Sequence, residues 1–412
     1  MPLGLYISVP FCRTKCSFCN FASGVFSRGA FAQYVDRVCA DMERAEKLAN
    51  EVGAQFECEV DSVYLGGGTP TVLDPEEIAR LFKTLRSTFR VVPDAEITVE
   101  CAPGTLKPEM LDALLTCGVN RVSLGVQSFV DQESASVGRL HTRAVILDDL
   151  ARLRAAGLTN ISLDLIAGLP HQTRDSWEYS LAETIAAGVP HVSVYMLEVD
   201  EDSRLGRELI AGGTRYHAHF VPDEDTTAGL YEQACDKLDS AGIRQYEISN
   251  FARADCQSRH NLKYWTREPY VGFGVDAHSM LCTSGLRSER TGQRPVPHES
   301  VRFATPDTLE AYLADPRPEL TSVSAPAALE EAYFLGLRLN RGVSFREMVE
   351  RYGPDAANAF ADEIRELCTL GLLSRDDDAV RLTARGRLLS NEVFQRFIRA
   401  GAGARSPSSA MK

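Results

Sequence analysis

The chain has 412 residues, of which 44% are hydrophobic and 25% charged, and its formal net charge at pH 7 is −13. This length predicts one large α/β unit with a smaller domain, and the acidic charge argues against a nucleic-acid partner. The sequence contains no run of about 18 apolar residues, the length needed to span a membrane. Its first residues lack the basic start that is typical of a signal peptide. Eleven cysteines in a chain without an export signal predict a cytoplasmic protein with mostly reduced thiols.

Strands and helices alternate through residues 1–240. Short β-branched segments occur at 5–9, 61–65, 96–100, 121–126, 161–167, 191–197 and 244–249. Amphipathic helical segments lie between them, at 31–49, 75–89, 107–118, 147–157, 175–188 and 226–242. Because parallel strands need crossover helices, this alternation predicts six or seven parallel β/α units. The fold class is therefore α/β, a full or partial TIM-type barrel with its functional groups at the carboxyl ends of the strands.

Polar, glycine-rich or cysteine-bearing signals fall at those strand ends. Three cysteines follow the first strand in a C-x₃-C-x₂-C spacing, and Gly66–Thr69 follow the second. Glu100 ends the third strand, Gln127 follows the fourth, and Asp164 lies in the fifth. These signals predict one functional mouth. The single cysteines elsewhere are interpreted as packing residues: Cys39, Cys58, Cys117, Cys235, Cys282 and Cys368.

The organisation changes after the barrel. Residues 241–325 are interpreted as an extension followed by a partly ordered connector, because the part after 283 is rich in Pro, Ser, Arg and Thr. Residues 326–398 predict a small winged-helix-like α+β domain of helices and a hairpin. It has no basic stripe, so a structural or protein-contact role is favoured over DNA binding. Residues 399–412 are small and polar and predict a disordered tail.

The three cysteines, Cys12, Cys16 and Cys19, are one ligand short of a structural zinc site. Soft thiolates select zinc, copper(I) or iron–sulfur clusters. One interpretation is an iron–sulfur cluster with one open iron. The alternatives are a zinc site completed by a distant His or Cys, and a chance grouping of three cysteines. The glycine-rich loop after the next strand favours the cluster.

The spacing resembles the signature of the radical S-adenosylmethionine (SAM) superfamily. More closely, the chain resembles the group that contains oxygen-independent coproporphyrinogen III oxidases and haem chaperones. The similar stretches are residues 6–12, 66–71, 100–105, 121–129, 164–173, 245–252 and 260–265, together with the C-terminal residues 371–397. The resemblance implies a [4Fe–4S] cluster on the three cysteines, with SAM on the fourth iron, whose reductive cleavage gives a 5′-deoxyadenosyl radical.

The resemblance also implies the residues that hold SAM. Glycines let the backbone approach an anionic group closely, and a carboxylate at the mouth would meet a cation. By resemblance, Glu100 binds the SAM ammonium. For the glycines the alternative to SAM binding is a bare tight turn, and for Arg139 it is a surface salt bridge. The full implied set is Tyr6, Phe18, Gly67, Gly68, Thr69, Glu100, Gln127, Arg139 and Asp164.

Two features separate the two branches of this group. The oxidases have a fourth cysteine two residues after the third, where this chain has Phe21. The stretch H-N-L-K-Y-W at 260–265 resembles a motif of the chaperone branch, and a segment with His260, Tyr264 and Trp265 is expected to roof the mouth and handle haem. A loop histidine satisfied by local hydrogen bonds is the alternative. Departures from the group pattern are Asn20 and the pair Cys101–Ala102, which leave the signature intact.

The favoured interpretation is a haem chaperone that binds the cluster, SAM and haem and delivers haem to haemoproteins of the respiratory chain. It leaves open peripheral membrane contact, a homodimer and enzymatic activity. The alternative is an oxygen-independent coproporphyrinogen III oxidase, which decarboxylates the propionates of its porphyrinogen substrate.

Overall fold

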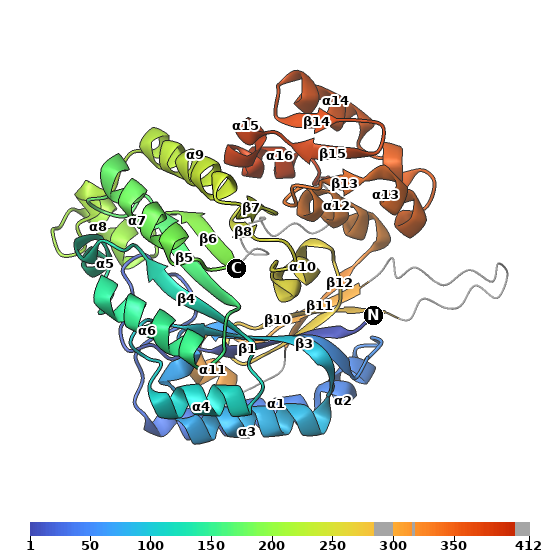
Figure 1. The fold of residues 1–412 in the computed structure, drawn as a ribbon. Helices are drawn as coiled ribbons and strands as arrows, with labels where there is room; N and C mark the ends of the chain where they lie inside the picture. Colours follow the sequence, from blue (N-terminus) through green and yellow to red (C-terminus); the bar gives the residue numbers. More distant parts are fainter. Residues whose placement is uncertain (284–299, 315–317, 400–412) are drawn as a thin grey trace.

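A computed structural model describes residues 1–283, 300–314 and 318–399 (Figure 1). Within these residues a 12-stranded sheet has the order β12-β11-β10-β9-β1-β2-β3-β4-β5-β6-β8-β7. Its parallel part consists of β1 (Leu3–Val9), β2 (Glu59–Gly67), β3 (Arg90–Cys101), β4 (Arg121–Gln127), β5 (Ile161–Ala167) and β6 (His191–Met196). The fold is an α/β fold with a large parallel sheet, as the sequence predicts.

The helices that follow these strands mostly cover the convex outer side of the curved sheet (Figure 1). They are α1 (Gly29–Glu43), α2 (Ala45–Glu51), α3 (Pro75–Thr88), α4 (Pro108–Thr116), α5 (Asp131–Ser136), α6 (Arg143–Ala155), α7 (Arg174–Ala186), α8 (Arg204–Ala211) and α9 (Glu224–Ser240), with short 3₁₀ turns η1 (Pro70–Val72) and η2 (Ala218–Phe220). In α3, a capping box of Asp74 and Glu77 begins the helix, and Ile78, Leu81 and Leu85 form its buried stripe. Such spacing places one apolar face against the sheet.

Of the six or seven parallel strands predicted for this part of the chain, six form, and the segment at 244–249 does not add a seventh. β7 (Arg244–Gln245) and β8 (Asn250–Ala252) pair antiparallel with each other, and β8 pairs antiparallel with β6. Four residues separate β7 from β8, and antiparallel strands need only such a short link, whereas a parallel pair needs a crossover of a dozen residues or more.

The other edge of the sheet is extended by residues beyond the barrel. β9 (Tyr270–Phe273) is parallel to β1, and β10 (His278–Cys282), β11 (Ser300–Ala304) and β12 (Glu319–Val323) follow as antiparallel neighbours. A short helix, α11 (Leu309–Ala314), connects β11 to β12 along the chain. The segment interpreted as a partly ordered connector therefore supplies two strands and a helix, and its remainder, 284–299 and 315–317, lies outside the described residues.

Helix α10 (Arg259–Trp265) lies on the inner side of the curved sheet (Figure 1). Glu96 of β3 accepts the backbone N–H groups of Arg259 and His260 at 3.1 Å each, which fixes the start of the helix. Lys263 forms a buried ion pair with Asp61 at the start of β2, at 2.8 Å. Helix α10 therefore closes the amino ends of the first strands. The expectation that this segment roofs the mouth is wrong, because the mouth is at the opposite ends of these strands.

The C-terminal unit has its own core. It contains α12 (Ala325–Gly336), β13 (Val343–Ser344), α13 (Phe345–Tyr352), η3 (Ala356–Asn358), α14 (Ala361–Thr369), β14 (Leu373–Arg375), β15 (Ala379–Leu382), α15 (Ala384–Leu388) and α16 (Ser390–Gln395). An antiparallel sheet of order β13-β15-β14 closes it, as in the winged-helix-like arrangement expected from the sequence. The rings of Tyr333, Phe360 and Phe397 pack together at its centre. Of the predicted tail, only Arg399 is described.

Three ion pairs join this unit to the rest of the chain in the described residues, and one of them links Arg302 of β11 to Glu331 of α12 at 2.8 Å. Arg267, just after α10, contacts Glu331 of α12 at 2.8 Å, and Arg338 contacts the buried Glu247 at 3.4 Å.

None of the described helices is long and apolar enough to cross a membrane.

Candidate cofactor site

The loop that carries the three cysteines is closed on itself directly after β1. Cys12 donates its backbone N–H to the carbonyl of Gly24 at 2.8 Å, and Gly24 donates to Pro10 at 2.8 Å. The ammonium of Lys15 donates to the carbonyls of Phe21 at 3.0 Å and Ser23 at 2.8 Å. These hydrogen bonds fix the shape of the loop.

Neighbouring loops also hold this loop at the mouth. Thr14 donates its hydroxyl to the carbonyl of Gly138 at 3.1 Å, and Leu205 of α8 donates its N–H to Ser17 at 2.9 Å. The three cysteines are partly buried and free of disulfides. Of the cysteines expected to be packing residues, Cys58 is exposed, so that interpretation is wrong for it.

Burial raises the pKa of the Cys12 thiol and of the Cys16 thiol, and the Arg139 guanidinium opposes this for Cys16. Cationic iron favours the thiolate, so binding a cluster would release these protons. Among the described residues, no three His, Cys, Asp or Glu side chains converge closely enough to hold one metal ion. Three thiols on one loop suit a [4Fe–4S] cluster, because a cluster binds each thiolate to a different iron.

The glycine loop after β2 packs directly against the cysteine loop. Gly68 donates to Val9 and Thr69 to Phe11, both at 2.8 Å. A Cβ on Gly68 would lie 2.7 Å from the Phe11 carbonyl oxygen and 3.0 Å from the Cys12 sulfur, and Gly67 has φ +99°. Glycine is therefore required for close packing of the two loops. The backbone N–H groups thought to meet an anion already donate to protein oxygens.

Glu100 lies at the carboxyl end of β3 with both carboxylate oxygens engaged. Tyr64 donates its hydroxyl to Oε1 at 2.8 Å, and the Gly67 N–H donates to Oε2 at 3.1 Å. Burial, followed by the charge of Asp164, raises the pKa of Glu100 to about 7 although these hydrogen bonds oppose it. A cation placed here would favour the ionised form, which suits a bound ammonium group.

Asp164 of β5 lies beside Ser123 of β4, whose hydroxyl is 3.0 Å from both carboxylate oxygens. Burial raises the pKa of Asp164, and hydrogen bonds from serine hydroxyls oppose this. The residue retains acceptor capacity for a ligand hydroxyl, as expected for a ribose contact.

Gln127 and Arg139 meet above Gly125. A Cβ on Gly125 would lie 3.1 Å from both Arg139 Nη2 and Gln127 Nε2. Gln127 has φ +66°, a left-handed backbone that is costly outside glycine and is often found at functional sites. The buried Arg139 Nε has no hydrogen-bond partner in the described structure. An unpaired buried guanidinium nitrogen suits a ligand carboxylate, and Arg139 is not a surface salt-bridge residue.

The two aromatic residues expected at the cofactor occupy different surroundings. Phe18, on the cysteine loop, packs against a small apolar cluster of Val137, Ile166 and Leu169. Tyr6, on β1, lies with its ring 6.2 Å from that of Tyr64. Both residues thus border the space between the cysteine loop and the strand ends.

His260 lies inside the barrel, away from the mouth. It is 1% exposed, and its two ring nitrogens contact the hydroxyls of Ser62 at 3.1 Å and Tyr264 at 2.8 Å. Burial, followed by Lys263, lowers the pKa of His260 to about 3. Trp265 lies under the guanidinium of Arg338, at 4.2 Å from the ring centre. In this conformation no ring nitrogen of His260 is free to ligate haem.

Tyr64 and Ser123 are site residues that the sequence analysis missed. Tyr64 lies on the same inward face of β2 as Ser62 and Gly66, and side chains two apart share a face of a strand. Alternation counted back from the glycine loop would have found it. Ser123 follows from the same count along β4, two residues before Gly125.

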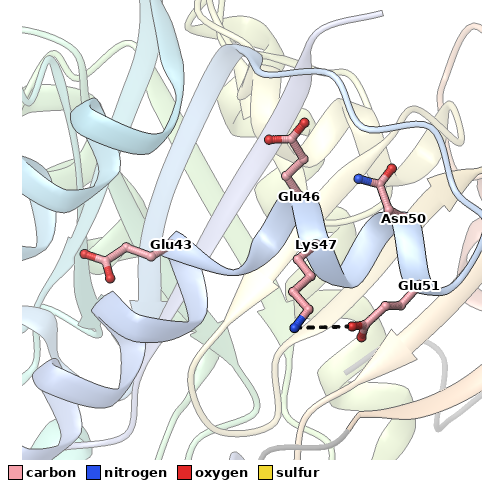
Figure 2. A pocket seen from close by; sticks show the side chains of 5 residues that line it. All are labelled: Glu43, Glu46, Lys47, Asn50 and Glu51. Atoms are coloured by element: carbon pink, nitrogen blue, oxygen red, sulfur yellow. Dashed lines mark ion pairs between the residues drawn. The ribbon is translucent and has the colours of Figure 1, made fainter.

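A hollow on the outer surface is unconnected with this site. Figure 2 shows its lining residues, Glu43, Glu46, Lys47, Asn50 and Glu51, at the end of α1 and along α2, with an ion pair between Lys47 and Glu51. This region leads to the start of β2, the end of the barrel opposite the cysteines. It supplies none of the predicted functional residues.

A curved parallel sheet with a three-cysteine loop at its carboxyl end defines a radical SAM protein. The family model of the radical SAM superfamily matches residues 6–183. The model of the HemN C-terminal domain matches residues 323–389, which contain most of the helices of the C-terminal unit. A solved structure of the coproporphyrinogen III oxidase HemN from Escherichia coli shares this fold, with a TM-score of 0.79 at 24% identity, and covers 96% of this chain and 90% of that one.

Curated relatives match almost the whole length. A heme chaperone HemW of Bacillus subtilis is 35% identical over 394 residues, covering 95% of this chain and 98% of the relative. A heme chaperone HemW of Mycobacterium tuberculosis is 31% identical over 96% of this chain and 95% of the relative. A mouse protein, radical S-adenosyl methionine domain-containing protein 1, mitochondrial, is 31% identical over 93% of this chain and 84% of its own length. The chain belongs to the radical SAM superfamily and, within it, to the family of the heme chaperone HemW relatives.

Proposed function

We propose that this chain is a haem chaperone that binds a [4Fe–4S] cluster, SAM and haem, and delivers haem to haemoproteins of the respiratory chain. The observation that carries this proposal is similarity over nearly the full length to relatives named heme chaperone HemW, at up to 35% identity. The three-cysteine loop and the polar strand ends support the cofactor part of the proposal.

Each residue of the mouth has a role in this proposal. Cys12, Cys16 and Cys19 hold the cluster, which together with SAM supplies one-electron chemistry when bound. Glu100 pairs with the ammonium group of SAM. The remaining contacts to SAM are proposed from the resemblance: Arg139 and Gln127 at the carboxylate, Asp164 at the ribose, Gly67, Gly68 and Thr69 along the amino-acid part, and Tyr6 and Phe18 as flanking rings.

The chain lacks the fourth cysteine of the coproporphyrinogen oxidases. Phe21 occupies that position and is 52% exposed, with its carbonyl engaged by Lys15. A benzyl side chain neither ligates metal nor transfers a proton. Delivery of haem rather than its synthesis is therefore the proposed role.

One experiment separates the two functions. Anaerobically reconstituted protein is given haem and, in a parallel sample, coproporphyrinogen III with SAM and a reductant. We expect a stable, stoichiometric haem complex in the first sample and no vinyl-bearing product in the second. Formation of that product would overturn the proposal, and so would the absence of haem binding.

A further inference from the structure

Two histidines outside the cofactor site contact each other at the same end of the barrel. His171 follows the carboxyl end of β5 by four residues, and His217 precedes η2. His171 Nε2 lies 3.0 Å from His217 Nδ1. Nitrogens of two imidazoles at this distance must share one proton between a donor and an acceptor.

The backbone holds both histidines in an unusual conformation. φ is +67° at His171 and +60° at His217, in the left-handed region. The backbone of Phe220 connects them: it accepts the N–H of His171 and donates its own N–H to His217, both at 2.9 Å. Left-handed non-glycine residues persist where the surrounding structure fixes them, and they are frequent at binding sites, as Gln127 illustrates here.

One tautomer of this pair prepares His217 as a metal ligand. In this tautomer the neutral His171 ring accepts at Nε2. His217 then donates from Nδ1, which leaves a lone pair on its Nε2. Metal-binding histidines in proteins donate their second ring N–H to a hydrogen-bond acceptor, which fixes the ring and raises its basicity. In this pair the acceptor is Nε2 of His171.

The surface around the pair is apolar and exposed. The Phe220 ring stacks on His171 with centroids 4.2 Å apart and is 53% exposed. Helix α8, which packs against η2, exposes Leu209 and Ile210 at 53% and 67%. Large apolar side chains grouped in this way indicate a binding surface. Exposed Arg207 and Arg215 lie on α8 and in the loop after it, where they could pair with carboxylates of a ligand.

We propose that His217 Nε2 is an axial ligand of haem iron, that His171 positions it, and that Phe220 and the exposed side of α8 contact the porphyrin face. This inference rests on the proposed function. A free metal ion fits less well, because two nitrogens are a short ligand set and the described residues contain no group of three that could hold an ion. Haem brings four nitrogens of its own and needs one axial ligand from the protein.

The test is a haem titration of the full chain, read by absorbance and by magnetic circular dichroism, which reports the axial ligand. His217→Asn and His171→Asn are the test variants, because asparagine tolerates the left-handed backbone. We expect His217→Asn to lose the histidine-ligated spectrum, and His171→Asn to bind haem about 10-fold more weakly, as for partners of metal-binding histidines. The exposed neighbour His219→Asn is the matched control and should bind like the unmodified chain.

The outcomes separate this inference from the proposed function. If the unmodified chain bound no haem, both would be wrong. If it bound haem and His217→Asn kept the same spectrum and affinity, the ligand assignment would be wrong while the chaperone function stood. Loss of the histidine signal in His260→Asn alone would also overturn the assignment. Zn²⁺ binding that depends on His217, with haem binding unchanged by the substitution, would assign the pair to a metal ion instead.

Discussion

The hydroxyl of Tyr64 donates a 2.8 Å hydrogen bond to the carboxylate of Glu100. The ring of the same tyrosine stacks on His260, with centroids 5.4 Å apart. Tyr64 therefore joins the mouth of the barrel to helix α10 at the opposite end. The helix bearing the H-N-L-K-Y-W stretch supports the candidate SAM site from below through this tyrosine, in addition to any part it has in haem handling.

The cluster prediction concerns Cys12, Cys16 and Cys19. Replacing any one of them by alanine should abolish the broad visible absorption of the anaerobically reconstituted protein, because each thiolate ligates one iron. Iron content and absorbance are the measurements. Cys58→Ala is the matched control, since this cysteine is exposed and remote from the loop. A triple alanine variant that still held about four irons per chain would contradict the assignment.

The Glu100 prediction concerns the pH dependence of SAM binding. Because the pKa of Glu100 is raised to about 7, the carboxylate is protonated below this pH and cannot pair with an ammonium group. SAM affinity of the unmodified protein should therefore rise between pH 6 and pH 8. Glu100→Gln should bind about 1.5–3 kcal/mol more weakly at pH 8 and remove the rise. Calorimetry at both pH values tests this, and equal affinity in the two proteins at pH 8 would exclude Glu100 from the site.

The His260 prediction concerns stability. A histidine whose pKa is about 3 in the folded state and about 6.5 in the unfolded state costs stability as the pH falls below 6.5. His260→Asn should be less stable at pH 7, by about 1–3 kcal/mol, because two buried hydrogen bonds change. At pH 5 the difference should shrink by about 2 kcal/mol, since the variant escapes the proton linkage.

Urea unfolding at the two pH values measures this difference. His219→Asn, an exposed histidine, serves as the control and should track the unmodified protein. A difference that stayed constant between pH 7 and pH 5 would show that the pKa of His260 is not lowered in the folded state.

The Arg267 prediction concerns the attachment of the C-terminal unit. Arg267 and Glu331 are 6% and 8% exposed, and Arg267 also contacts Ser300 at 3.2 Å. Glu331 also pairs with Arg302 at 2.8 Å, so Arg267→Ala removes one of its two arginine partners and should lower the free energy of unfolding by about 1.5–3 kcal/mol. Arg346→Ala breaks an exposed pair with Glu350 and should cost less than about 1 kcal/mol. Similar losses in the two variants, measured by denaturant unfolding, would refute the structural role of Arg267.

The sequence was sufficient to predict the parallel part of the fold, and it placed several candidate site residues near the ends of the strands. Parallel strands all end at one edge, so a polar signal after each strand predicts a shared site; Glu100 and Gln127 lie at the carboxyl ends of β3 and β4, and Asp164 lies in the middle of β5. The chemical environment was not predictable. That Glu100 titrates near 7 depends on its burial, its closeness to Asp164 and the hydroxyl of Tyr64, which no spacing reveals.

The location of His260 shows where the sequence analysis failed. Helix α10 is seven residues long, and Glu96 and Asp61, which hold it, are more than 160 positions away in the chain. Nothing local in the stretch indicates that it turns inward. The pairing of β7 with β8 was missed for a related reason: strands of two and three residues carry too little alternation to reveal their direction.

Transfer of haem to a recipient tests the central claim most directly. The full chain, carrying its cluster and one haem, is mixed with membranes that contain a haem-free respiratory cytochrome, and the cytochrome spectrum is followed in time. The account predicts that haem leaves the chain and appears in the cytochrome faster than from an equal amount of haem bound to albumin. Transfer no faster than from albumin, with haem retained on the chain, would contradict it.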